Sequence, residues 1–433
     1  MNISSFIARR ITFNQSQSFT KLIINIGITA VALSVMVMIL STSLFKGFKS
    51  EITEKVYNFW GHIHISDANT KRTFEAIPIE MDTAFVNRLK RLPPQEYQAP
   101  SAWYNFGAQD KFSMKLTNGA IKNISAFIVL PAILDTNKEF EGTYLRGLTK
   151  NYEWSRLDPF LKEGRWINFG DSSSITEIVL SRNTSDRINK VSGDQIIVNF
   201  VLQGQQIRKR LNIVGIYNTG IEEYDKQFAI VDMKLLQDAL FWESNQIAGY
   251  EVVLDNMDDV SVLNEYIYIE ELPPRLYSES IYEKFDNIFS WLELQDINEQ
   301  VIFLLMIIVA IITMITTYLI LILERTKTIG ILKSLGANNM DVVKIFLYCA
   351  FYIILRGMII GNLLGFGIAL FQKITGIISL DEKNYLVDTA PILFDFPVIV
   401  LINAGVLILT LMFLLIPSLL IAQVKPVRIF RFN

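Results

Sequence analysis

The stretch ERTKTIGILKSLGANN, residues 324–339, decides the fold because it separates two long apolar segments. The 23 residues before it, 301–323, carry no charge, and the chain becomes apolar again from residue 345. Within the stretch, apolar side chains recur at helical spacing, at positions Ile329, Ile331, Leu332 and Leu335. The pattern predicts one short amphipathic helix in a water-exposed connection between two membrane spans.

The ends of this short helix also have signals. Thr328 is a predicted N-cap, Lys333 is expected to stay solvated, and Gly336 is typical of a helix stop. Asn338 followed by Asp341 resembles a cap for the next helix. A helix with one apolar side either lies on the lipid surface or fills a groove on a cytoplasmic partner, and amphipathicity alone does not choose between these.

Four segments are long and apolar enough to cross a bilayer. A spanning helix needs about 20 apolar residues for a hydrocarbon core of about 30 Å. Residues 22–45, 301–323 and 398–422 carry no charge, and residues 345–371 carry only Arg356. A cleaved signal peptide is not expected at 22–45, since KGFKSE after it shows no small-residue cleavage pattern.

The basic residues set the predicted orientation. Lysine and arginine flank the spans on the cytoplasmic side. Basic side chains precede the first span and follow the last, and they outnumber acidic ones in 324–344. The net charge of the whole chain is −3, so the acidic excess lies mainly in 46–300. Both termini and the 324–344 loop are therefore predicted to be cytoplasmic, with 46–300 and 372–397 outside.

The large segment between the first two spans is predicted to be an α+β domain. Strand-like alternation appears in 61–66, 174–181, 195–202, 206–217 and 249–254, with a hairpin turning near Gly204. Helical patterns separate the strands at 82–92, 232–242 and 260–267. Both edges of the domain look helical and continuous with the adjoining spans, which predicts helical stalks.

Enzyme signatures are absent from the sequence. There is no GxxxxGK[ST] phosphate loop, so any ATP hydrolysis is expected in another chain. HExxH, GxSxG and CxxC patterns are also missing, and the single cysteine, Cys349, excludes an intrachain disulfide. The only histidines, His62 and His64, lack obvious further ligands, so a plain strand is favoured over a zinc site.

The third span contains a charge beside a stripe of small residues. Arg356 precedes Gly357, and Gly361 and Gly365 follow at intervals of four residues. Such spacing favours close approach of another helix. Arg356 either holds an interhelical contact, including one across a subunit interface, or extends toward the nearer headgroups.

Several stretches resemble one family of membrane proteins along the whole chain. ERTKTIGILKSLGANNMDVVKIFL is similar to the coupling segment of FtsX-like permeases, the membrane subunits of ABC transporters of the macrolide-exporter type. FIARRITFN, IVGIYNTGIEEYD (213–225), NYLVDTAPILFDF (384–396) and PVRIFRF resemble the lipoprotein-releasing (Lol) branch. Two departures are Arg356–Gly357, where the family often has Gln-Gly, and a short hairpin at VLQGQQIRKR where one member has a carrier-docking arm.

The resemblance implies a membrane fold of the type VII ABC permease architecture, with four transmembrane helices and a periplasmic α+β domain between the first two. The implied divisions are 1–21 cytoplasmic, 22–45 first span, 46–300 periplasmic domain with stalks, 301–323 second span, 324–344 coupling loop, 345–371 third span, 372–397 periplasmic loop, 398–422 fourth span and 423–433 cytoplasmic tail.

The resemblance also implies a function in the inner membrane of a Gram-negative bacterium. The chain would be a permease without catalytic residues, metal or cofactor, while ATP and Mg²⁺ bind a separate cytoplasmic ATPase subunit. That ATPase would drive release of lipoproteins from the outer leaflet. Further partners would be a second permease copy or paralogue, membrane lipid and a periplasmic lipoprotein carrier, with no nucleic acid.

Three sets of residues are assigned to this function. The coupling set is Glu324, Arg325, Ile329, Gly330, Leu332, Lys333, Leu335 and Gly336. The helix-packing set is Arg356, Gly357, Gly361 and Gly365. Apolar walls for acyl chains are expected from Met36, Leu40, Phe45, Phe48 and Phe303. The alternatives are an exporter or a regulator of cell-wall hydrolases with the same architecture, or a membrane sensor outside transport.

Overall fold

The computed structural model describes residues 6, 8, 18–70, 76–100, 112–136, 140–169, 172–202 and 205–423. The chain divides into two compact units, which are described separately. The helical unit comprises Met1–Glu51, Ser290–Leu380 and Thr389–Asn433. The sheet unit comprises Ile52–Phe289 and Asp381–Asp388. The predicted turn at Gly204 and the tail beyond Gln423 lie outside the described residues.

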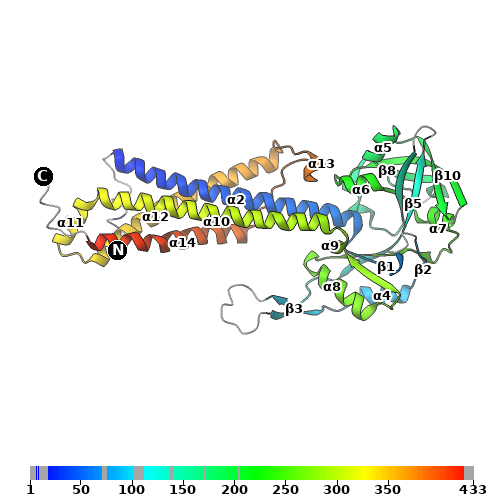
Figure 1. Ribbon diagram of the computed structural model, residues 1–433, viewed down its shortest axis with the longest axis horizontal. Coiled ribbons are helices and arrows are strands. Elements are labelled where there is room, and N and C mark those ends of the chain that lie inside the picture. The colour runs from blue at the N-terminus through cyan, green and yellow to red at the C-terminus, as the bar shows by residue number, and fades with distance from the viewer. Residues whose placement is uncertain are drawn as a thin grey trace. The chain divides into compact units, whose positions relative to one another are not determined.

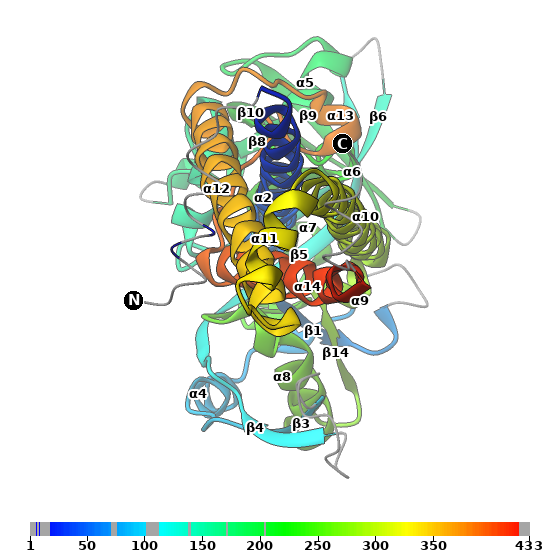
Figure 2. The same cartoon turned by 90° about the vertical axis from the view of Figure 1, so that its left-hand side faces the viewer.

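Four long helices are apolar enough to cross a membrane, and they run side by side in Figures 1 and 2. These are α2 (Ser18–Trp60), α10 (Asp286–Glu324), α12 (Asn339–Thr375) and α14 (Phe396–Gln423). The short α11 (Thr326–Ser334) connects α10 to α12. Buried side chains from all four long helices form one apolar core that includes Val35, Tyr318, Phe346 and Val406.

The stalks predicted at both edges of the domain are present as parts of longer helices. α2 continues without a break for 15 residues past the last residue of the predicted first span, Phe45, to Trp60. α10 begins at Asp286, well before the predicted second span. Neither stretch contains proline to interrupt the hydrogen-bond ladder, so each span and its stalk form one continuous helix.

Polar contacts join the helices of the helical unit at several levels. Lys46 on α2 pairs with Asp395, and Lys49 pairs with Asp296 at 2.6 Å. Within the apolar part, the side-chain amide of Asn362 on α12 donates to the Asn403 carbonyl oxygen on α14 at 2.7 Å, and the Asn403 amide returns a bond of 3.1 Å. An amide pair satisfies groups that lipid cannot, so it fixes the register of the two helices.

The sheet unit is built on a mixed ten-stranded sheet. Its order is β14–β1–β13–β5–β6–β11–β8–β10–β7, and β9 pairs with both β10 and β5. The strands are β1 (Ile63–Asp67), β5 (Ile121–Asp135), β6 (Phe140–Leu148), β7 (Leu161–Gly164), β8 (Glu177–Ser181), β9 (Gln195–Leu202), β10 (Gln205–Tyr217), β11 (Phe228–Asp232), β13 (Gly249–Leu254) and β14 (Leu276–Ser280).

Smaller elements complete the sheet unit. Two short ribbons pair β2 (Ile79–Glu80) with β12 (Gln246–Ile247) and β3 (Glu96–Pro100) with β4 (Phe112–Leu116). The helices are α4 (Thr83–Lys90), α5 (Arg182–Ile188), α6 (Glu222–Gln227), α7 (Met233–Leu240), α8 (Val260–Tyr266), α9 (Ile281–Lys284) and α13 (Glu382–Tyr385). Single turns or short irregular helices are η1 (Trp154–Arg156), η2 (Asp158–Phe160), η3 (Ser172–Thr176), η4 (Met257–Asp259) and η5 (Ile267–Glu271).

The α+β prediction is confirmed, with corrections to individual elements. The β9–β10 hairpin forms antiparallel pairs along its whole length. The strand predicted at 174–181 begins only at Glu177, because η3 occupies Ser172–Thr176. The long strand β5 was not predicted: its buried positions do not alternate regularly and Pro131 interrupts its pattern. A strand buried on both faces lacks the two-residue period that identifies half-exposed strands.

Candidate functional site

The predicted coupling helix forms between α10 and α12. Arg325 occupies the N-cap position of α11, and Leu335 occupies the C-cap. Gly336 then takes a positive φ of 91°, which suits a residue without a Cβ and turns the chain toward α12. The predicted cap at Thr328 is wrong, because Thr328 lies inside the helix. Asn338 is the N-cap of α12, but its side chain makes no capping hydrogen bond.

The apolar residues of α11 lie on two faces rather than one. Ile329 and Gly330 are buried, and Leu332 is half-buried against the core of the helical unit. Ile331 is 51% exposed and Leu335 is 80% exposed. The predicted single apolar side is therefore corrected: Ile329 and Leu332 pack α11 on the core of the helical unit, whereas Ile331 and Leu335 are exposed.

The charged residues beside α11 are less exposed than expected. Glu324 is half-buried, and its carboxylate accepts a hydrogen bond from the Thr20 hydroxyl of α2. This bond joins the start of the first long helix to the end of the second. Lys333 is also half-buried, and partial loss of hydration lowers its pKa. Glu324 and Arg325 thus mark a packed helix junction as well as the boundary of the apolar span.

The glycine stripe of α12 packs against α2. A Cβ on Gly357 would lie 2.7 Å from Cβ of Val31, and one on Gly361 would lie 2.6 Å from the Ala32 carbonyl oxygen. Gly365 is similarly close to Ile39 at 3.2 Å. The stripe therefore allows close approach of two helices within this chain. Arg356, next to Gly357, is half-buried.

The predicted acyl-chain residues are all half-buried. Met36 lies beside Gly365 at the α2–α12 contact, with its Cα 3.4 Å from the position of an added Cβ. Phe303 on α10 packs against the helical core. Leu40, Phe45 and Phe48 follow on α2 and are also half-buried. These side chains retain apolar surface for lipid or a bound chain.

A second candidate region lies in the sheet unit, where the family-like motif IVGIYNTGIEEYD forms a closed loop. The Asp225 carboxylate accepts hydrogen bonds from the backbone N–H groups of Thr219 at 3.1 Å and Gly220 at 3.2 Å, and from the Thr219 hydroxyl at 3.0 Å. The ring of Tyr224 stacks on Phe59, with centroids 5.5 Å apart. The motif therefore closes its own loop and packs on the last turn of α2.

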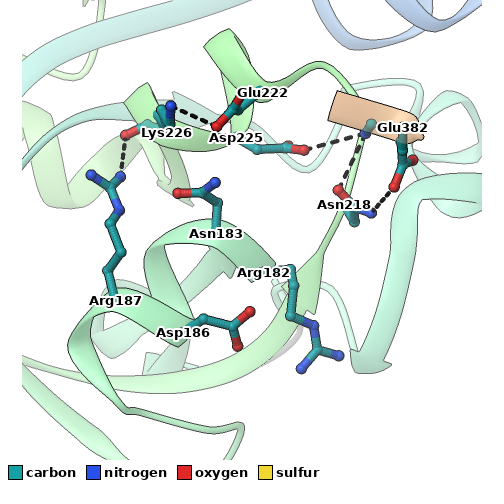
Figure 3. A pocket seen from close by; sticks show the side chains of 10 residues that line it. Arg182, Asn183, Asp186, Arg187, Asn218, Glu222, Asp225, Lys226 and Glu382 are labelled. Carbon is teal, nitrogen blue, oxygen red and sulfur yellow. Dashed lines mark hydrogen bonds and ion pairs between the residues drawn. The ribbon is translucent and has the colours of Figure 1, made fainter. Parts of the chain in front are cut away.

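The segment Asp381–Asp388 contacts the same loop. The amide of Asn218 donates to Glu382 at 3.2 Å, and Lys55 on α2 donates to the Leu386 carbonyl oxygen at 2.9 Å. Figure 3 shows Asn218, Asp225 and Glu382 around one cavity of about 420 Å³. The loop of the first motif thus meets Glu382, which lies two residues before the NYLVD stretch, at the same site.

Charged side chains from α5 and α6 form the rest of this cavity. Arg187 donates to the Lys226 carbonyl oxygen at 3.1 Å, and the Lys226 ammonium pairs with Glu222 at 2.6 Å. Arg182 pairs with Glu163 at 2.5 Å. These cations are paired within the sheet unit, so the cavity is a polar junction between α5, α6 and the Asp381–Asp388 segment.

Asp225 is expected to make the sheet unit pH-sensitive. Burial raises the pKa of Asp225 from 3.8 to about 6, hydrogen bonds from Thr219 and Gly220 oppose this, and the Glu382 charge adds to it. Because the native state holds this proton more tightly than the unfolded state, stability falls as pH rises from about 3.5 to 6.5. The loss is about 3 kcal/mol, at about 1.4 kcal/mol for each pKa unit.

The measurement is the unfolding of the full-length protein and of Asp225→Asn at both ends of that pH range, followed by tryptophan fluorescence. Five of the six tryptophans lie between residues 60 and 242. The stability of the wild type relative to the variant should fall from the acidic to the neutral pH. Asp225→Asn also removes one hydrogen-bond acceptor, but that loss of stability is the same at both pH values and therefore does not affect the change between them. An equal difference at both pH values would show that folding does not raise the pKa of Asp225.

The two histidines are structural in the described chain. His62 Nδ1 accepts the Leu254 N–H at 3.1 Å, and His64 Nε2 donates to the Trp60 carbonyl oxygen at 2.6 Å. Burial lowers the pKa of His62 to about 3. Among the described residues, no group of three or more histidine, cysteine or carboxylate side chains is arranged to hold a metal ion.

Comparison with known families agrees with this architecture. A model of the MacB-like periplasmic core domain matches residues 26–267, and a model of the FtsX-like permease C-terminal region matches residues 300–426. The first match alone spans more than half of the chain. The chain therefore belongs to the FtsX-like permeases with a MacB-like periplasmic core domain, and it is a multi-pass permease subunit of an ABC transporter.

Individual relatives cover nearly the whole chain at low identity. The lipoprotein-releasing system transmembrane protein LolE of Haemophilus influenzae is 23% identical over 451 residues, covering 99% of both chains. LolC of Neisseria meningitidis is 22% identical over 451 residues, covering 98% of both. Among solved structures, the extracellular domain of the transporter YknZ is similar, with 12% identity and a TM-score of 0.30, covering 51% of this chain and all of that one.

Proposed function

We infer that this permease releases lipoproteins from the outer leaflet of the inner membrane of a Gram-negative bacterium. The observation that carries the inference is similarity to the LolE and LolC proteins along 98–99% of both chains. The similarity includes the spans, the α11 region and the sheet unit together. Both termini and α11 would lie in the cytoplasm, with the sheet unit in the periplasm.

The energy source would be an ATPase subunit encoded by another gene. That subunit binds ATP and Mg²⁺ and receives the outer face of α11, where Ile331 and Leu335 are exposed. Burial of such side chains contributes about 25 cal/mol per Å² of apolar surface. The inner face of α11 packs on the helical unit through Ile329 and Leu332. A push on α11 would therefore move α10 and α12 with it.

The substrate would reach the complex from the membrane. The acyl chains of a lipoprotein need apolar walls, and α2 and α10 offer the half-buried Phe45, Phe48 and Phe303. Membrane lipid would occupy the same walls between transport cycles. A second copy of this chain or a paralogue would complete the transporter, and a periplasmic carrier would receive the released lipoprotein.

Depletion of this chain in its own cells tests the function. Lipoproteins destined for the outer membrane should accumulate in the inner-membrane fraction, because their acyl chains cannot leave the bilayer unaided: each buried CH₂ contributes about 0.8 kcal/mol. Density-gradient fractionation and immunoblotting of several lipoproteins would measure this. Correct sorting after depletion, combined with a defect in cell-wall hydrolysis or in efflux, would assign the chain to another branch of the family.

A further inference from the structure

The end of α2 is held in the sheet unit by a buried cluster of charges. Arg146 on β6 and Arg156 on η1 both pair with Glu251 on β13, the second pair at 2.7 Å. The side chains of Arg146 and Glu251 are fully buried, and that of Arg156 is 7% exposed. The Tyr152 hydroxyl adds a hydrogen bond to Glu251 at 3.2 Å.

Both guanidinium groups also bind the last turn of α2. Arg146 donates to the Phe59 carbonyl oxygen, and Arg156 donates to the Tyr57 carbonyl oxygen. The final carbonyls of a helix have no partner within the helix and carry partial negative charge. The Tyr57 oxygen also accepts the Gly61 N–H at 2.7 Å, so Arg156 adds a second hydrogen bond there, while Arg146 gives the Phe59 oxygen a side-chain donor. Both cations offset the partial negative charge of the helix end.

The geometry around the cluster leaves little freedom for the helix end. The Arg146 guanidinium lies 5.1 Å from the ring centroid of Phe59 and 4.8 Å from that of Trp60. Gly61, at φ 76°, ends the helix, and a Cβ there would collide with the Glu251 side chain. The final turn is thus held by charge, by ring contacts and by close packing.

Stability alone does not account for such a cluster. A buried ion-pair triad can often be replaced by apolar side chains of similar volume without loss of stability, because desolvation offsets its attraction. What apolar replacements cannot do is donate hydrogen bonds to helix carbonyls. The cluster therefore has a directional role, which is to fix the end of α2 relative to three adjacent strands, β13, β5 and β6.

We propose that Arg146, Arg156 and Glu251 form a clamp that passes movement of the first membrane helix to the sheet unit. This inference rests on the proposed function, since α2 is one continuous helix from Ser18 to Trp60 and would be displaced in each ATP cycle. A loosened clamp would let α2 pivot at Gly61. ATP would still be hydrolysed, but less of the movement would reach the sheet unit.

The test uses the full-length permease in complex with its ATPase, in lipid nanodiscs. The main variant is Arg156→Gln, at the least buried of the three positions, and the second is Glu251→Gln. Arg165→Gln is the matched control, because it removes an arginine that pairs with Glu177 at 2.6 Å in the same unit. Spin labels at Glu54→Cys on α2 and Val191→Cys report the distance between helix end and sheet, and the only native cysteine is buried.

The wild type and the control should give one narrow distance distribution, with or without ATP. Arg156→Gln and Glu251→Gln should give a broad distribution. They should also keep ATP hydrolysis while lipoprotein release per ATP falls at least about tenfold, within the usual range of coupling between sites. Narrow distributions in both variants, or unchanged release per ATP, would overturn the clamp. If the wild type released no lipoprotein, the proposed function would be wrong. The distances between the two spin labels would still show whether Arg156 and Glu251 hold the end of α2.

Discussion

Replacing Leu335 by aspartate is expected to detach the ATPase subunit while leaving the permease folded. Leu335 is 80% exposed at the end of α11, so the fold does not depend on its side chain. In the complex the new carboxylate would be buried without a partner, which costs about 3–5 kcal/mol. Each 1.4 kcal/mol corresponds to about tenfold in affinity, so binding should weaken at least about a hundredfold.

Co-purification and substrate-stimulated ATP hydrolysis measure this effect. Leu335→Met is the matched control, since it keeps an apolar side chain of similar volume. Val191→Asp adds the same charge at a 58% exposed position in the sheet unit. Both controls should retain the ATPase. Leu332 is unsuitable for this test, because it packs on the helical core and its loss would disturb the fold. Wild-type binding by Leu335→Asp would mean that α11 lies on lipid.

Gly361→Leu should destabilise the helical unit by forcing α12 away from α2. An added Cβ would lie 2.6 Å from the Ala32 carbonyl oxygen and 2.9 Å from Cβ of Val35, before any further side-chain atoms are placed. Overpacking of this kind costs about 1–3 kcal/mol. The backbone oxygen cannot rotate away as a side chain would, so the upper part of that range is expected.

The measurement is the thermal stability of the purified full-length protein in detergent. Gly367→Leu on the same helix is the matched control, because a Cβ there meets nothing within 4 Å. Leucine also has a better helix propensity than glycine by about 1 kcal/mol, so the control should melt at the wild-type temperature or slightly above it. Equal melting temperatures of Gly361→Leu and Gly367→Leu would show that Gly361 does not face α2 in the folded protein.

The four membrane spans could be predicted from the sequence because charge-free segments long enough to cross a bilayer are rare in soluble domains. The α11 segment could be predicted as a helix, but its inward and outward sides could not be assigned. At about 100° per residue, Leu332 lies about 60° from Ile329 on one side and about 60° from Leu335 on the other. The apolar positions therefore spread around this nine-residue helix, and their spacing does not mark which side faces inward. The distinction depends on where α10 and α12 lie, which is tertiary information.

The clamp was missed because its members are far apart in the sequence and ordinary in local context. Glu251 is nonetheless a charge inside the apolar strand GYEVVL, and Arg146 follows Tyr144-Leu145 in a buried strand. A charged residue in the middle of a buried strand signals a partner. The sequence could therefore have flagged Glu251 and Arg146 as candidates, but not that their partners include carbonyls at the end of α2.

Release of a purified acylated lipoprotein from proteoliposomes tests the central claim most directly. The vesicles would contain this permease, its ATPase and the second permease where one is required. The wild-type complex should transfer the lipoprotein to the soluble fraction when ATP and Mg²⁺ are added and a periplasmic acceptor is present, and the Leu335→Asp complex should not. A lipoprotein that stays in the vesicles while the wild-type complex hydrolyses ATP at full rate would contradict the account.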